Sequence, residues 1–370
     1  MDAANLVAEI KVERVDVQAD PKFVNTYAAQ ATILSLTRVA ASLTAPPQPG
    51  DLITITGLGG ERDNSGVLYA GMPRPLINQK YTAYLSRATD GTYQIQGFEL
   101  GLRPEAVLRN YSRNRTDGSN GDGTGPFLFW DDSYFPLPYY ISADSFEGLR
   151  PFLSAVDAAF GTWRAVDNIK VEFLAMGCSN DTVDRNDGIN NVIFVTQNWP
   201  FDPTAIAITR NFYLAGDSPR SGMILDTDIM INAQDHQFTT TGESGKYDLQ
   251  DILTHEVGHF LGMGHEVPPL DTQATMYALA FPGELNKRTL HPDDLAGIRS
   301  AYGGVGIKLG PPHSDCAVPS GLPLGCMAVH RDGARPLGPL AAIFYLLLLV
   351  GLARRTGAYT RAKTPQLPFK

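Results

Sequence analysis

The stretch that decides the fold is THEVGHFLGMGH, residues 254–265. His255 and His259 are four residues apart, which places both imidazoles on the same side of a helix. Gly262 can end that helix in the left-handed conformation, so the chain can turn and bring His265 in from a new direction. Three imidazole nitrogens suit tetrahedral Zn²⁺ and leave its fourth position for water. The stretch therefore predicts a helix that carries a zinc site.

Glu256 is the expected general base of this site. It directly follows His255, so it lies beside the metal without being a ligand, and it can accept a proton from the water. An HExxH pattern alone also arises by accident in buried helices. Agreement at positions 255, 256, 259, 262 and 265 together is expected by chance on the order of once in 10⁵ chains of this size. The pattern therefore favours hydrolysis of peptide bonds.

The residues around this stretch predict a mixed α/β region that begins near Phe127. Apolar residues recur at intervals of three and four from Leu153 to Trp163, which indicates an amphipathic helix. Asp248 is a suitable N-cap for the helix that contains His255, and Pro292 is a favoured first residue for a last helix that ends at Gly303. Short apolar runs predict strands at residues 137–141, 169–174, 191–196 and 223–232.

The histidine pattern resembles the zinc signature of the metzincin peptidases. The resemblance covers roughly residues 127–304 and is closest to the matrixin branch, the matrix-metalloproteinase-like peptidases, in its bacterial type. The run Ala274-Thr275-Met276-Tyr277 resembles the Met-turn of the family, and residues 291–303 resemble its closing helix. Glu266, after the third histidine, is more similar to the astacin branch, so the branch stays open.

The resemblance implies a fold and a set of site residues. The expected fold is an α/β (α+β) catalytic domain with a twisted mixed sheet and an active-site helix, preceded by a small all-β domain. Residues 223–232 are expected to form the edge strand that pairs with an extended substrate. The implied metal ligands are His255, His259 and His265, with Glu256 catalytic and with Gly262, Met276 and Tyr277 as structural support.

Shifts in composition predict six segments along the 370 residues. Short alternating runs and frequent turn residues at the start indicate β-structure, and Gly and Pro are concentrated between the later segments. The predicted segments are an all-β domain (1–103), a linker (104–126), the catalytic domain (127–304), a Gly/Pro-rich linker (305–336), a transmembrane or sorting segment (337–353) and a basic tail (354–370).

The C-terminal segment suggests where the protein works. Residues 337–353 carry no charge and are followed by Arg354 and Arg355, as expected for a membrane span with a cytoplasmic tail. A buried terminal helix is the alternative. The first residues show no signal peptide, because charged side chains interrupt the apolar run. We expect an extracellular or cell-surface protein anchored through this segment.

Composition and isolated residues add weaker expectations. A net charge of −9 argues against nucleic acid as a partner, and the oligomeric state stays open. Cys316 and Cys326 could close a short loop in an oxidising compartment, which would leave Cys178 as a buried thiol. Calcium could bind near Asp226, Asp228 or residues 181–187, although a solvated turn explains these acids equally well.

These observations together predict a zinc-dependent endopeptidase that acts on extracellular proteins or peptides. Two alternatives stay open. One is a non-catalytic surface adhesion module that keeps the peptidase fold for binding. The other is an autolysin that cuts the peptides of the cell wall.

Overall fold

The computed structural model describes most of the chain up to residue 314. The described residues are 4–314 apart from 63, 71, 73–74, 76, 78–79, 97–101, 105–110, 118–124, 143–149, 180–184, 267–271, 307, 310–311 and 313. They lie within one compact unit, Met1–Met327. The predicted segments 337–353 and 354–370, and most of 305–336, lie outside the described residues. Within the described part, no helix is long and apolar enough to cross a membrane.

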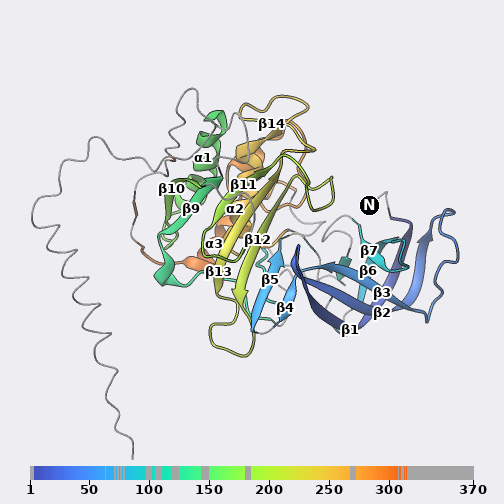
Figure 1. The fold of residues 1–370 in the computed structure, drawn as a ribbon. Coiled ribbons are helices and arrows are strands. Elements are labelled where there is room, and N and C mark those ends of the chain that lie inside the picture. The colour runs from blue at the N-terminus through green and yellow to red at the C-terminus, as the bar shows by residue number, and fades with distance from the viewer. Residues whose placement is uncertain are drawn as a thin grey trace, which may run out of the picture. The chain divides into compact units, whose positions relative to one another are not determined.

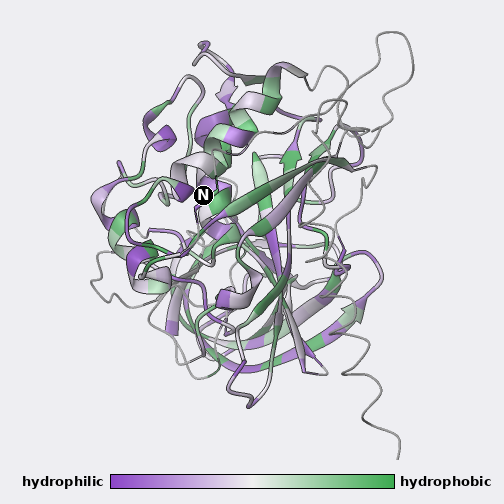
Figure 2. Cartoon of the chain, turned by 90° about the vertical axis from the view of Figure 1, so that its left-hand side faces the viewer, coloured by the Kyte–Doolittle hydropathy of each residue, from purple (hydrophilic) through white to green (hydrophobic). Residues whose placement is uncertain are grey.

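The N-terminal region forms a closed β-barrel. Five strands pair in the order β1-β2-β3-β7-β6, and β1 also pairs with β6 to close the ring, while β8 extends it from β6. The strands are β1 (Leu6–Asp20), β2 (Val24–Val39), β3 (Leu52–Leu58), β6 (Lys80–Arg87), β7 (Tyr93–Ile95) and β8 (Leu102–Pro104). Burial alternates from Tyr27 to Ile33 of β2, so every second side chain of this stretch enters the barrel core. Figure 2 shows hydrophobic and hydrophilic residues interspersed along the strands. The boundaries of this region as a domain stay a prediction.

A second sheet carries the candidate site. Its order is β10-β9-β11-β13-β12-β5-β4 (Figure 1). Strands β10, β9, β11 and β13 are parallel, β12 runs antiparallel to β13, and β5 runs antiparallel to β12. The strands are β4 (Gly60–Arg62), β5 (Ser65–Tyr69), β9 (Leu137–Ser142), β10 (Phe173–Ser179), β11 (Asn191–Val195), β12 (Ala207–Leu214) and β13 (Ile224–Asn232). The expected mixed sheet is therefore present, and a hairpin from the N-terminal region extends it.

Three helices complete this part of the molecule. They are α1 (Leu153–Arg164), α2 (Leu249–Phe260) and α3 (Pro292–Tyr302), with short 3₁₀ turns η2 (Asp132–Tyr134), η4 (Arg150–Phe152) and η5 (Asn286–Arg288) and a small pair β14 (Phe238–Thr239) and β15 (Tyr247–Asp248). The apolar face of α1 packs on α2 in one buried core. Trp163 also donates from Nε1 to the carbonyl of Thr254 at 2.7 Å. This contact fixes α2, the helix of the histidine pattern.

The prediction that residues 223–232 form the edge strand is wrong. Residues 223–232 do not form the edge, because β13 pairs with β11 on one side and β12 on the other. The sequence did not reveal β12, since Arg210 and Asn211 interrupt its apolar run. Both are buried, and Asn211 donates to the carbonyl of His259 at 3.2 Å and accepts from Thr227 at 2.8 Å. A hydrogen-bonded polar side chain, Asn211, thus lies inside a strand that a hydrophobicity pattern would miss.

The strand predicted at residues 169–174 lies further along the chain. The strand there, β10, begins at Phe173, and Ile169 instead forms an isolated bridge with Gly303. The backbone N–H of Lys170 donates to the carbonyl of Tyr302, so this stretch is held by the end of α3 rather than by the sheet.

The described part of the predicted linker is not a free connector. The N–H of Asn114 donates to the carbonyl of Gly262 at 2.9 Å, and the N–H of Leu128 donates to the carbonyl of Asn114 at 2.8 Å. Tyr213 on β12 donates to the carbonyl of Thr116 at 2.9 Å. Residues 111–117 are therefore bonded both to the turn after α2 and to the second sheet.

Candidate metal centre

The three histidines of the pattern converge on one point. The Nε2 atoms of His255, His259 and His265 lie 2.8, 2.9 and 3.1 Å from one another. All three residues are buried, and they are the one grouping of three or more potential metal ligands among the described residues. Three neutral imidazole nitrogens that share one centre form a donor set that zinc prefers.

The opposite ring nitrogens orient two of these imidazoles. Nδ1 of His255 lies 2.7 Å from the carbonyl of Thr275, and Nδ1 of His259 lies 2.8 Å from the carbonyl of Met263. A carbonyl only accepts, so each Nδ1 carries the proton and each Nε2 presents a lone pair. Burial and the neighbouring histidines lower the pKa of both rings well below the usual value, which keeps them neutral. The residues therefore fit a metal bound through Nε2.

Glu256 lies beside the three rings. Thr209 of β12 donates from Oγ1 to Oε2 of Glu256 at 2.6 Å. Burial raises the pKa of Glu256 to about 7, and the bond from Thr209 opposes that rise. A carboxyl group with a pKa near neutrality can both accept and return a proton. Thr209 was not singled out in the sequence, because nothing local to it predicts a contact with a residue on α2.

Gly262 makes the turn that brings in the third histidine. It has φ +82°, and the N–H of Met263 donates to the carbonyl of Gly258 while the N–H of Gly262 donates to that of His259. These two bonds are those of a Schellman motif, which closes a helix through a left-handed residue. A Cβ at Gly262 would lie 2.7 Å from the carbonyl oxygen of Leu128. The turn therefore requires glycine for both its dihedral angle and its space.

Comparison with known proteins identifies this part of the chain. A family model described as matrixin matches residues 131–303. These residues form a matrixin-like metzincin domain. Metalloendoproteinase 1 of Glycine max is 29% identical over 157 residues, which are 41% of this chain and 46% of the relative. Metalloendoproteinase 4-MMP of Arabidopsis thaliana is 29% identical over 175 residues, 44% of each chain.

A shorter and more similar match comes from a mammal. Matrix metalloproteinase-19 of Homo sapiens is 40% identical over 73 residues, 20% of this chain and 14% of the relative. The chain thus spans less than half the length of the curated relatives it matches. The metzincin and matrixin resemblance is confirmed, while the bacterial type stays a prediction.

Met276 packs against α2, and Tyr277 lines the cavity that contains the three histidines. A Cβ at Gly258 on α2 would lie 2.2 Å from the sulfur of Met276, so the side chain of Met276 packs directly against the helix there. The N–H of Tyr277 donates to the carbonyl of Ala274, which makes a turn, and Tyr277 borders the same cavity as the histidines. The turn thus places Thr275 where its carbonyl can bond His255.

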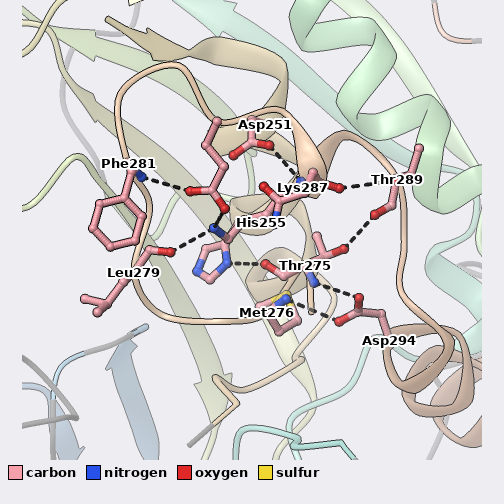
Figure 3. A network of polar contacts seen from close by, with 11 residues as sticks. Asp251, His255, Thr275, Met276, Leu279, Phe281, Lys287, Thr289 and Asp294 are labelled. Atoms are coloured by element: carbon pink, nitrogen blue, oxygen red, sulfur yellow. Dashed lines mark hydrogen bonds and ion pairs between the residues drawn. The ribbon is translucent and has the colours of Figure 1, made fainter. Parts of the chain in front are cut away.

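Asp294 fixes this turn from the start of α3, as Figure 3 shows. Its carboxylate accepts from the N–H of Thr275 at 2.9 Å and from the N–H of Met276 at 3.2 Å. Thr275 also donates from Oγ1 to the carbonyl of Thr289 at 3.0 Å. Asp294 therefore positions His255 indirectly, because it fixes the backbone of Thr275, whose carbonyl bonds Nδ1 of His255. The sequence did not reveal this role.

We expect Asp294→Asn to weaken metal binding without removing a ligand. An amide cannot accept two backbone N–H bonds as a carboxylate does, so the Thr275 carbonyl would lose its fixed orientation. Loss of an outer partner of a metal-bound histidine typically costs about 10–100-fold in affinity. Competition with a chelator measures the change. Asp293→Asn is the matched control, since Asp293 bonds the neighbouring His291 instead of the turn, and equal effects of the two changes would contradict this role.

Residues 279–287 form one wall of the cavity, and the buried side chain of Lys287 fixes them. Lys287 donates from Nζ to the carbonyl of Leu279 at 2.8 Å and to Glu284 at 3.0 Å, and its N–H donates to Asp251 on α2 at 2.7 Å (Figure 3). These bonds tie residues 279–287 to α2. The wall and β12 enclose a cavity of about 430 Å³ that also contains the three histidines and Glu256.

The structure does not support the calcium expectation. Asp226 accepts from the N–H groups of Asp187 and Gly188, and Asp228 accepts from those of Arg185 and Asn191. These carboxylates therefore fix the backbone that leads into β11, and no described grouping besides the histidines is suited to a metal. Residues 181–184 lie outside the described residues.

Cys178 differs from its expected state. It is disulfide-bonded rather than a free thiol, and its partner lies outside the described residues. The prediction of a buried thiol is therefore wrong. Neither Cys316 nor Cys326 is among the described residues.

Proposed function

We propose that this chain is a zinc-dependent endopeptidase that hydrolyses peptide bonds of extracellular proteins through an activated water. The observation that carries the proposal is the convergence of three Nε2 atoms, 2.8–3.1 Å apart, beside Glu256 in one cavity. His255, His259 and His265 would hold the zinc. When bound, zinc would polarise the carbonyl of the scissile bond and lower the pKa of a water molecule.

Glu256 performs the proton transfers in this proposal. Thr209 fixes Oε2, so we assign Oε1 as the oxygen that accepts the proton of the attacking water. The same carboxyl group then donates this proton to the nitrogen of the leaving amine. A pKa of about 7 allows both steps near neutral pH, because neither protonation state is strongly favoured.

The substrate is expected to bind as an added strand. An extended peptide can pair with an exposed sheet edge, and residues 204–208 at the start of β12 line the cavity. Ile208, Ile252 and Leu279 give that cavity apolar walls. We therefore assign an apolar side chain of the substrate to this space.

The disulfide at Cys178 supports action outside the cytoplasm. Disulfides persist in oxidising compartments and are rare in reducing ones. This favours the expected extracellular or cell-surface location. Anchoring through residues 337–353 stays a prediction of the sequence.

Removal of the metal should abolish cleavage. We expect the full chain to bind one zinc, to lose casein hydrolysis in a strong chelator and to regain it when zinc is restored. His259→Ala should lose both zinc and activity, because two imidazoles bind zinc much more weakly than three. His236→Ala is the matched control, since His236 is not among the histidines whose nitrogens converge. Zinc binding without any cleavage would instead favour the non-catalytic adhesion module, and cleavage that persists after zinc removal would contradict the proposal.

A further inference from the structure

The outer side of β12 is already partly occupied by the protein itself. β5 pairs with β12 antiparallel in the register Ser65↔Leu214 to Tyr69↔Arg210. One residue further on, the N–H of Ala70 donates to the carbonyl of Thr209 at 2.8 Å. The pairing thus reaches the residue whose side chain bonds Glu256. In Figure 1, β5 lies alongside β12 in the same sheet.

The pairing then stops abruptly. The N–H of Met72 donates to the carbonyl of Tyr69 at 3.0 Å, which turns the chain away from β12. Ala207 and Ile208 of β12 lie beyond this turn, and within the described part of the chain no strand pairs with their outer side. Ala70, Ala207 and Ile208 all line the cavity that contains the histidines. Among the described residues, the unpaired part of the edge therefore begins where β5 ends.

The geometry of a β-ladder determines how much of the β12 edge is left for a substrate to pair with. Outward-facing backbone groups alternate along a strand, so after Thr209 the next residue of β12 that can bond a partner outward is Ala207. A peptide that continues along this edge in the direction of β5 would have its amino end against Ala70. The scissile bond must lie near Glu256, which Thr209 bonds, so about two residues of the peptide fit between the position that Ala70 holds and that bond.

Several contacts indicate that β5 is a fixed part of the fold. Val67, Leu68 and Tyr69 are each at most 3% exposed, and Leu68 belongs to the same buried core as α2. A Cβ at Gly66 would lie 2.2 Å from the ring of Tyr213, so β5 and β12 are packed as closely as glycine allows. Displacing this strand would expose an extended apolar surface.

Polar contacts tie the same strand to the barrel and to β12. Tyr69 donates from its hydroxyl to the carbonyl of Phe23 at 2.9 Å and accepts from Arg210 at 3.1 Å. Val67 and Tyr69 also share a buried cluster with Phe212 and Met230 of the matrixin-like domain. The N-terminal barrel and the catalytic sheet are therefore joined through β5 by both apolar and polar contacts.

We propose that β5 permanently takes the place of the amino-terminal side of the substrate, so that recognition depends mainly on residues after the scissile bond. This rests on the proposed peptidase function. The N-terminal region then acts as a fixed cap on the substrate-binding edge. Residues of the substrate more than about two positions before the scissile bond gain no pairing with β12.

Two series of synthetic peptides test this on the full zinc-loaded chain. Both start from one short peptide that the enzyme cleaves. One series adds one to six residues before the scissile bond and the other adds them after it. We expect kcat/KM to stop rising after about two residues in the first series and to rise about tenfold or more in the second. A continued rise with the third to sixth residues of the first series would overturn the proposal.

A variant at the end of β5 tests the same boundary. Ala70 lines the cavity but is only 4% exposed, so Ala70→Leu adds bulk at the edge of the substrate space. We expect about a tenfold lower kcat/KM for a peptide with two residues before the scissile bond, with an unchanged thermal unfolding midpoint. Ser65→Leu is the matched control at the opposite, exposed end of β5. Equal effects of the two changes would contradict the boundary. If the enzyme cleaves no peptide from which a series can start, the peptidase function itself fails, which is a different outcome from cleavage that improves with amino-terminal length.

Discussion

Glu256→Gln should lower kcat/KM for a peptide substrate by about 10²–10⁴-fold while zinc stays bound. Glutamine keeps the shape of the side chain and can still accept the bond from Thr209, but its amide has no basic oxygen to take a proton. Glu256 is not one of the three residues that would bind the metal, so the variant should retain zinc. The loss corresponds to about 3–5 kcal/mol in the activation barrier.

The measurement pairs hydrolysis rates with zinc content and thermal unfolding. Thr209→Val serves as a graded comparison, because it leaves the carboxylate in place and removes the hydroxyl that holds Oε2 at 2.6 Å. Losing one hydrogen bond to a charged group costs about 1.5 kcal/mol, or roughly tenfold in rate. Undiminished cleavage by Glu256→Gln would exclude Glu256 as the base. Loss of zinc in that variant would mean that the carboxylate supports the metal instead.

Local sequence signals predicted the helix at the site well. The side chain of Asp248 accepts from the N–H of Asp251 at 3.1 Å, as expected of an N-cap, and Pro292 is the first residue of α3. Gly262 has the left-handed φ that the helix end needs. These features depend on residues within one or two helical turns of each other, so a single sequence contains the information for them.

The features that the sequence did not reveal depend on distant partners. Arg210 bonds Tyr69, which precedes it by 141 residues, and Asp294 bonds the backbone of Thr275 across 19 residues. β12 lacks a regular apolar alternation because polar residues such as Thr209, Arg210 and Asn211 are buried within it. Pairing of β5 with β12 follows from tertiary packing rather than from any local pattern, and so the role of the N-terminal region could not be read from its residues.

The N-terminal region reduces the length of β12 that a substrate can pair with. A matrixin-like domain considered alone would end its sheet at β12, and an extended peptide could pair along the whole strand. With β5 in place, five residues of β12, from Arg210 to Leu214, already have partners on that side. The fold of the N-terminal region thus bears directly on the choice of substrate, although none of its residues belongs to the histidine cluster.

Gly262→Ala should strongly destabilise the turn that brings in His265. Forcing a non-glycine residue to hold φ +82° costs about 1–3 kcal/mol. The new Cβ would also lie 2.7 Å from the carbonyl oxygen of Leu128, a backbone atom that cannot move aside as a flexible side chain can. Overpacking of this kind adds about 1–3 kcal/mol. We therefore expect a total loss of about 2–6 kcal/mol in the free energy of unfolding, measured by denaturant titration.

Gly245→Ala separates the two causes. Gly245 has φ +84°, and a Cβ there meets nothing within 4 Å, so this control carries the cost of the dihedral angle without the clash. The difference between the two variants is then the cost of the contact with Leu128. Zinc affinity gives a second readout, because a shifted turn moves His265 away from His255 and His259, whereas Gly245 lies outside the cluster. Equal destabilisation by both substitutions, with zinc affinity unchanged, would show that the close approach at Gly262 does not position the third histidine.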